Sequence, residues 1–335
     1  KNYGEEIQKQ LYNDFGIKNS VLFQVKEEYC PCGETYFPFD PNGIVVKMSG
    51  GLGNQMFQYA FGRCFEKKGK RVSYELSYYT NMERHFILAD VFKNSKLTFC
   101  HPEYLSSLPV IREPDIKLVQ KLEADLELLK ADTGYFSGYW QSYQYVDLVR
   151  QELVEEFRFP EEKEAQLEKL AKAAASQNSV SVHIRRGDYL EDGNQKLFAG
   201  ICTEEYYTRA FELILKLAGD CKFYIFSNDT EWVKEHYKND AFTIVESKRF
   251  EDYQDWYDIY LMSCCKHNVL ANSTFSWWGA WLNQYVDQIV IAPGRVVNTC
   301  DVVDFYPKEW IRLPASEKKR SDNGKQDIDG YNTNL

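Results

Sequence analysis

Apolar and polar positions follow two different periods along the second half of the chain. Short apolar runs rich in β-branched residues predict strands at 180–184, 222–226, 242–245, 267–270 and 288–291. Between them, apolar residues at helical spacing predict helices at about 203–218, 230–238, 254–265 and 276–284. Strands that alternate with helices are typical of a parallel sheet with crossover helices, so we expect an α/β domain here.

The first half begins with a strand, a glycine-rich turn and a helix. Residues 44–48 predict the strand, and apolar residues from Met56 to Phe65 predict the helix, which ends at Gly69. Backbone N–H groups in such a turn can approach an anion or a sugar, although a tight turn without a ligand has the same pattern. A dinucleotide-binding motif is disfavoured, because Met56 stands where its third glycine would be.

The remainder of the first half is less regular. A strand is expected at 71–76 and irregular chain at 78–109, followed by helices at 115–130, at about 145–156 and at 161–175. Small and aromatic residues alternate from 134 to 142. Aromatic rings in such a stretch either bind sugar rings or pack in a core, and the sequence leaves both roles open.

Length and composition favour a globular protein of two domains. We expect the 335 residues to form an N-terminal extension at 1–42, domains at 43–160 and 161–315, and a disordered polar tail at 316–335. The net charge of −10 argues against a nucleic-acid partner, and no run of about 18 apolar residues or signal-peptide pattern occurs. We therefore expect a soluble protein.

The nine cysteines show no disulfide framework and are expected to be reduced thiols. Cys30 and Cys32 could be half of a zinc site, but none of the five histidines lies near them in the sequence. A zinc site is therefore disfavoured.

Polar residues follow four of the five predicted strands of the second half. Since the carboxyl ends of parallel strands meet at one edge, where open α/β sheets bind ligands, these residues predict a nucleotide site. Adjacent guanidinium groups suit a diphosphate, and a helix capped at Ser273 offers N–H groups to a phosphate. An ion pair with Asp188 and simple helix capping are the alternatives. The polar groups are Arg185-Arg186, 227–229, 272–274 and 293–295.

Five separated segments then identify a family. Over about residues 43–313 the chain resembles the α-1,2-fucosyltransferases of glycosyltransferase family 11 through GGLGNQMFQYA, GYWQS, HIRRGDY, FSNDTEW and NSTFSWWGAWL. The resemblance implies a GT-B architecture, in which two Rossmann-like domains face a cleft. The N-terminal domain would hold the acceptor and the C-terminal domain GDP-β-L-fucose. The implied reaction is inverting transfer of L-fucose to the 2-hydroxyl of a terminal β-galactose.

The resemblance also implies roles for single residues. Arg185 would contact the diphosphate and stabilise the charge that grows on it, His183 would lie near the nucleotide, and Asn54 would face the reaction centre. The general base is left open between Asp188, Asp229, Glu75 and His85. Further expected donor contacts are Arg186, Asp229, Ser273, Thr274, Ser276, Gly51 and Gly53.

No metal or other cofactor is expected, because the one Asp-x-Asp pair, Asp327 and Asp329, lies in the polar tail. The expected partners are GDP-fucose and a galactoside glycan, with peripheral membrane association left open. We expect a bacterial cytoplasmic enzyme, and a luminal origin is the alternative. Transfer to another hydroxyl, another nucleotide sugar, and a sugar-nucleotide- or glycan-binding module without turnover are the competing functions.

Overall fold

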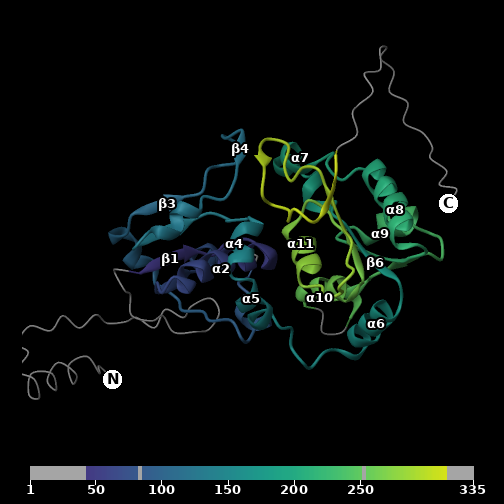
Figure 1. The fold of residues 1–335 in the computed structure, drawn as a ribbon, viewed down its shortest axis with the longest axis horizontal. Coiled ribbons are helices and arrows are strands. Elements are labelled where there is room, and N and C mark those ends of the chain that lie inside the picture. The colour runs from purple at the N-terminus through teal and green to yellow at the C-terminus, as the bar shows by residue number, and fades with distance from the viewer. Residues whose placement is uncertain (1–42, 82–84, 251–253, 315–335) are drawn as a thin grey trace, which may run out of the picture.

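The computed structural model describes residues 43–81, 85–250 and 254–314 as two α/β halves (Figure 1). The N-terminal half has a four-stranded sheet in the order β2-β1-β5-β3, and the C-terminal half a six-stranded sheet in the order β12-β10-β9-β6-β7-β8. Every pairing in both sheets is parallel. Two parallel sheets with helices around them confirm the α/β, GT-B architecture expected from the sequence, while the domain boundaries at 160/161 and 315/316 stay predictions.

The N-terminal half is built from short elements. Its strands are β1 (Ile44–Lys47), β2 (Val72–Glu75), β3 (Val110–Arg112) and β5 (Gly134–Ser137). Its helices are α2 (Leu52–Lys67), α3 (Leu88–Val91), α4 (Tyr143–Leu148) and α5 (Arg150–Glu156), with 3-10 turns η1 (Ser77–Asn81), η2 (Pro102–Ser107) and η3 (Leu126–Lys130).

The C-terminal half alternates strands and helices as predicted, with a strand at Ile311–Leu313 and a helix at Asp192–Phe198 that the sequence did not predict. Its sheet consists of β6 (Ser179–Ile184), β7 (Lys222–Ser227), β8 (Phe242–Ile244), β9 (His267–Val269), β10 (Val290–Pro293) and β12 (Ile311–Leu313). Its helices are α6 (Ala165–Ser176), α7 (Asp192–Phe198), α8 (Glu204–Ala218), α9 (Thr230–His236), α10 (Trp256–Cys264) and α11 (Thr274–Trp281), with 3-10 turns η4 (Gly187–Leu190) and η5 (Ser247–Arg249).

The helix predicted at 115–130 is wrong. The segment forms a turn, the two-residue strand β4 (Lys121–Leu122) and the 3-10 turn η3. β4 pairs with β11 (Asp301–Val302), a strand about 180 residues later in the sequence that the periodicity did not reveal. This pairing with a distant segment overrides the local helical spacing of the leucines.

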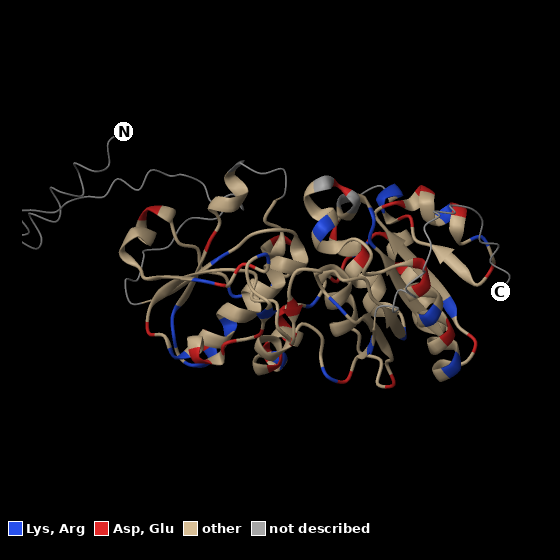
Figure 2. Ribbon diagram, turned by 90° about the horizontal axis from the view of Figure 1, so that it is seen from above, with Lys and Arg blue, Asp and Glu red and all other residues tan. Residues whose placement is uncertain are grey.

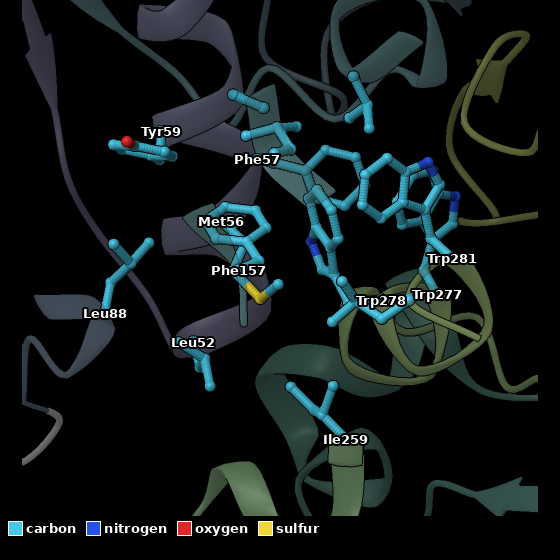
Figure 3. Packing of buried hydrophobic residues seen from close by; sticks show 14 of the residues in the cluster. Leu52, Met56, Phe57, Tyr59, Leu88, Phe157, Ile259, Trp277, Trp278 and Trp281 are labelled. Carbon is cyan, nitrogen blue, oxygen red and sulfur yellow. The ribbon is translucent and has the colours of Figure 1, made fainter. Parts of the chain in front are cut away.

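Helices α2 and α11 join the two halves through a shared aromatic core. The ring of Phe57 on α2 lies 4.7 Å from Trp277 and 5.0 Å from Trp278 on α11, as Figure 3 shows. Both tryptophans are fully buried, and the indole Nε1 of Trp278 donates a hydrogen bond to the carbonyl oxygen of Gly53 at 2.9 Å. The hydrophobic cluster around them includes residues of both sheets, so the two halves share one hydrophobic core.

Gly53 allows the close approach of α2 to α11. A Cβ at this position would lie 2.7 Å from Thr274 Oγ1 and 2.9 Å from the Thr274 backbone carbon. Gly53→Ala is therefore expected to lower the free energy of unfolding by about 1–3 kcal/mol, because a backbone atom cannot move aside easily. Urea unfolding followed by circular dichroism measures the loss. Gly193→Ala is the control, since nothing lies within 4 Å of its added Cβ, and equal stability of the two variants would contradict the expectation.

Charge and thiols add little to the architecture. Basic and acidic residues are interspersed along the ribbon of both halves (Figure 2). The seven cysteines of the described segments are free thiols, and the candidate ligands Cys30 and Cys32 lie outside these segments. Within residues 43–81, 85–250 and 254–314, no three His, Cys, Asp or Glu side chains are arranged to hold a metal ion. No helix of the described chain has the length and apolarity needed to cross a membrane.

Candidate active site

Arg185 lies at the carboxyl end of β6, where two neighbouring cavities meet. β6 is buried along its whole length and pairs with β7 on one side and β9 on the other, so Arg185 leaves the sheet near its middle. Cavity A, of about 360 Å³, and cavity B, of about 530 Å³, are both lined by Arg185. The two cavities also share Gly51, Leu52 and Phe275. The predicted arginine therefore lies between two adjoining cavities.

Cavity A lies at the ends of β6 and β7 and is lined by residues of both halves. His183, Ser227 and Asn228 contribute from these strands, with Asp258 from α10 and Lys248 from η5. The N-terminal half closes it with Gly51, Leu52, His85 and Ile87. Polar groups thus converge at the sheet edge where the sequence predicted a nucleotide.

His183 is neutral and presents a polar atom without a partner. Only 4% of the residue is exposed, and its Nδ1 has no hydrogen-bond partner within the described structure. Burial lowers the pKa of the imidazole to about 3, and the charge of Arg185 lowers it further in the same direction. A buried polar atom without a partner at a cavity wall is suited to a ligand that supplies the missing hydrogen bond.

Arg186 and Asp229 bind each other rather than lining a cavity. Arg186 Nε donates to Asp229 Oδ2 at 3.2 Å, and the guanidinium lies 4.0 Å from the centroid of the Trp232 ring. Asp229 also caps α9 by accepting from the Trp232 backbone N–H at 3.2 Å. The backbone N–H of Arg186 donates to Asn228 Oδ1 at 2.9 Å, which fixes the loop after β6. Their predicted contact with the donor stays a prediction.

Asp258 is a carboxyl group of cavity A that sequence reasoning missed. Burial raises its pKa to about 6, and Asp255 acts in the same direction, while a hydrogen bond from Ser247 and the charge of Lys248 oppose the shift. The signal in the sequence was an aspartate inside the apolar run of α10, where an isolated charge needs a reason. This group is half-ionised near pH 6 and ionised at neutral pH.

Cavity B lies between the two halves. Its wall in the C-terminal half includes Arg185 and the residues around the N-terminus of α11, where Ser273 caps the helix through the Phe275 N–H at 3.3 Å. The partial positive charge of a helix N-terminus favours an anion, as does Arg185 beside it. Ser276 does not line either cavity, because it is fully buried and donates back to the carbonyl oxygens of Ala271 and Ser273.

Asn54 connects the halves at the floor of cavity B. Its Oδ1 accepts one hydrogen bond from Thr274 Oγ1 and another from Gln141 Nε2, both at 3.0 Å. Gln141 follows β5, so three segments far apart in the sequence meet at one amide oxygen. Gly51 and Gly53 line the same cavity. The sequence placed Asn54 opposite the C-terminal domain, but it gave no sign of Gln141 as its partner.

Gln55 fixes the part of the N-terminal half that closes cavity A. It is fully buried, and its Nε2 donates to the carbonyl oxygens of Gly50 and His85 at 3.1 Å each. Its Oε1 accepts from the backbone N–H groups of Ile87 and Leu88, also at 3.1 Å. All its polar groups are therefore used to hold the glycine-rich turn against the His85–Leu88 segment, a role that sequence reasoning missed.

The four candidates for a general base are placed differently. His85 lines cavity A, whereas Glu75 is fully buried and accepts a hydrogen bond from the Tyr135 hydroxyl at 3.0 Å. Asp229 is engaged with Arg186. Asp188 belongs to η4, but its side chain lies outside the described part of the chain. Of the three candidates whose side chains are described, His85 alone lines cavity A or B, and the choice of base among the four stays a prediction.

Comparisons with known proteins identify the family of this chain. The model of glycosyl transferase family 11 matches residues 45–314. An alpha-1,2-colitosyltransferase of Escherichia coli is 32% identical over 288 residues, which cover 81% of this chain and 98% of that protein. The Homo sapiens galactoside alpha-(1,2)-fucosyltransferase 1 is 25% identical over 281 residues, which cover 81% of this chain and 74% of that protein.

Among solved structures, the NodZ alpha-1,6-fucosyltransferase soaked with GDP-fucose matches with a TM-score of 0.44 and 12% identity, over 72% of this chain and 92% of that chain. The family match and the E. coli relative each cover most of the chain. The chain belongs to glycosyltransferase family 11.

Proposed function

We propose that the protein transfers L-fucose from GDP-β-L-fucose to the 2-hydroxyl of a terminal β-galactoside, with inversion at the anomeric carbon. The observation that carries the proposal is the position of Arg185, which lines both cavities. In this arrangement the nucleoside occupies cavity A, the diphosphate lies at Arg185 and the N-terminus of α11, and the acceptor enters through cavity B.

The chemistry follows from the charges at this junction. When the bond between the sugar and the β-phosphate breaks, negative charge grows on the leaving GDP. A fixed guanidinium and a helix N-terminus stabilise that charge more in the transition state than in the bound substrate, which lowers the barrier. The proposal uses protein groups for this purpose and no metal ion. Transfer that persists in excess EDTA would support this part.

The donor sugar is the point at which the relatives differ. A relative of this chain is an alpha-1,2-colitosyltransferase and another is an alpha-(1,2)-fucosyltransferase. Colitose is fucose without its 3-hydroxyl, so the two donors differ by one polar group. A site that binds the 3-hydroxyl would reject the deoxy sugar strongly, since its own polar group would lose its partner. Transfer of colitose is therefore the second candidate function.

Competition between donors tests the proposal. The protein is incubated with lactose and equal amounts of GDP-fucose and GDP-colitose in excess EDTA, and the trisaccharide is identified by mass and linkage analysis. A Fucα1-2Gal product in excess supports the proposed function. A colitosyl product in excess supports the second candidate, and GDP binding without any product would indicate a binding module.

The raised pKa of Asp258 predicts how the affinity for the donor nucleotide depends on pH. Guanine presents two neighbouring N–H donors on one edge, and an ionised carboxylate in cavity A can accept both. Since the pKa of Asp258 is about 6 in the empty site, GDP affinity is expected to fall as the pH drops below 6, by about tenfold per unit. Calorimetric titration with GDP between pH 5 and 8 measures the dependence.

The control for this prediction is Asp258→Asn. A terminal phosphate also titrates near pH 6, and the pH dependence that persists in the variant belongs to the nucleotide. We expect the variant to bind GDP about 10-fold to 100-fold more weakly at pH 8, because hydrogen bonds to a charged group are lost. Equal affinities at pH 8 would show that Asp258 does not contact the base.

A further inference from the structure

The proposed function brings the acceptor to cavity B but assigns no contact to the wall that belongs to the N-terminal half. This wall faces Arg185 and the N-terminus of α11 across the cavity. It combines one aromatic ring with several polar side chains, which is the combination that carbohydrate sites use. The polar and aromatic residues of the wall are Asn54, Asp115, Lys117, Tyr139 and Gln141.

The Tyr139–Trp140 turn is held in a strained conformation. Trp140 has φ +54°, a value that bulky side chains rarely adopt. Its ring stacks on Phe61 in the core, with centroids 4.3 Å apart and planes 7° from parallel. The carboxylate of Glu113 accepts the backbone N–H of Tyr139 at 2.7 Å and that of Trp140 at 3.0 Å. Backbone strain of this kind persists only where the surrounding structure enforces it, and it is found preferentially at functional sites.

The consequence of this turn is the position of Tyr139. Trp140 points into the core, whereas Tyr139 is 45% exposed and lines cavity B. Gln141, the next residue, reaches Asn54 on the floor of the cavity. Of the other aromatic residues from 134 to 142, Phe136 and Trp140 are buried in the core, and Tyr135 donates to Glu75 and lines neither cavity. The sugar-binding role left open for this stretch therefore falls to Tyr139.

Asp115 is the one carboxylate among the described residues that line cavity B. Its Oδ1 accepts the backbone N–H of Lys117 at 2.9 Å, which shapes the turn before β4. Two lone pairs of a carboxylate remain available on the second oxygen for a ligand hydroxyl. Sequence reasoning passed over Asp115 because it placed the residue at the start of a helix that does not form.

We propose that Tyr139 and Asp115 form the acceptor subsite of this enzyme. The apolar face of the terminal galactose stacks on the Tyr139 ring, and the attacking hydroxyl donates its hydrogen bond to Asp115. This inference rests on the proposed function. As the hydroxyl oxygen bonds to the anomeric carbon, the bond from that carbon to the β-phosphate oxygen breaks. Its electron pair leaves with the phosphate at Arg185, and the hydroxyl proton passes to the Asp115 carboxylate.

Asp115→Asn tests the proton transfer. An asparagine oxygen can still accept from the Lys117 N–H, so the turn is kept and only the charge is lost. We expect kcat to fall by about 10²-fold to 10⁴-fold. The KM for the donor should stay the same, because Asp115 does not contact the donor in this arrangement, and Asp115→Glu should recover part of kcat.

Tyr139→Ala tests the stacking. We expect the acceptor KM to rise by about tenfold, with the donor KM unchanged, and Tyr139→Phe to restore it, since the phenylalanine keeps the ring. Tyr285→Ala is the matched control, because Tyr285 is 38% exposed and does not line cavity A or B.

The two proposals fail separately. If the wild-type enzyme makes the trisaccharide but Asp115→Asn keeps kcat within about threefold, or Tyr139→Ala keeps the acceptor KM within about twofold, the acceptor subsite is overturned and the proposed function stands. If the wild-type enzyme transfers no sugar from GDP-fucose or GDP-colitose, the proposed function fails. Saturation-transfer NMR with lactose then decides the subsite without turnover: loss of lactose binding in Tyr139→Ala supports it, and unchanged binding overturns it.

Discussion

Arg185→Lys is expected to lower kcat by about 10²-fold or more while the protein remains folded. Lysine keeps the positive charge but replaces a planar fork of N–H donors with a single ammonium, so it cannot hold two diphosphate oxygens at once. One well-placed donor to a developing anion is worth about this factor. Because the lost contact is strongest in the transition state, kcat should fall more than the KM for the donor rises.

Arg186→Lys is the matched comparison for this prediction. The Arg186 guanidinium pairs with Asp229 and lies over Trp232, and it does not line cavity A or B. A loss of less than about tenfold is expected there. Steady-state kinetics of both variants, with circular dichroism to verify the fold, make the comparison. A kcat within threefold of wild type for Arg185→Lys would remove Arg185 from the mechanism.

Trp278→Ala is expected to lower the free energy of unfolding by about 3–5 kcal/mol, the usual cost of emptying a large aromatic site in a core. The ring is fully buried and packs against Phe57 and, edge-on at 5.4 Å, against Phe157. Its loss also leaves the buried carbonyl oxygen of Gly53 without the Nε1 donor. The damage would lie at the contact between α2 and α11, so activity should fall together with stability.

Two comparison variants separate the loss of packing from the loss of the hydrogen bond as causes of the lower stability. Trp278→Phe keeps most of the packing and loses the hydrogen bond to Gly53, so a smaller loss of about 1–3 kcal/mol is expected. Leu118→Ala removes an apolar side chain that is 84% exposed and should change stability by less than about 0.5 kcal/mol. Urea unfolding followed by circular dichroism measures all three. A loss below about 1 kcal/mol for Trp278→Ala would show that the halves do not depend on this contact.

The sequence was informative where the structure is locally determined. Five of the six strands of the C-terminal sheet follow from the apolar period, whereas β12 and α7 were not predicted. The polar groups at the ends of β6, β7 and β9 line the two cavities at one edge of that sheet. The motif residues Arg185, His183 and Asn54 line the two cavities because the predicted strand β6 and the predicted glycine-rich turn before α2 place them there. Their roles in the reaction stay predictions.

The parts of the fold and of the candidate site that the sequence did not predict depend on contacts between segments far apart in the sequence. The segment from 115 to 130 has leucines at helical spacing, yet its pairing with β11 gives it another shape. Asp115 and Asp258 became candidates only when folding placed them at cavities. The alternation of small and aromatic residues from 134 to 142 contained the strand β5 and a strained turn, and no local pattern distinguishes an inward tryptophan from an outward tyrosine.

The pairing of β11 with β4 brings a late segment of the chain back to the N-terminal half, and this limits how the two halves can move apart. Next to β11, Asp304 Oδ2 accepts hydrogen bonds from Ser142 Oγ at 2.7 Å and from Gln144 Nε2 and the Ala124 N–H at 2.8 Å each. The two halves are thus in contact at a second place besides the aromatic interface of α2 and α11. Two separate contacts restrict rotation of one half relative to the other about a single linker. Separation of the two halves would therefore have to break both contacts, the aromatic interface of α2 and α11 and the hydrogen bonds at Asp304.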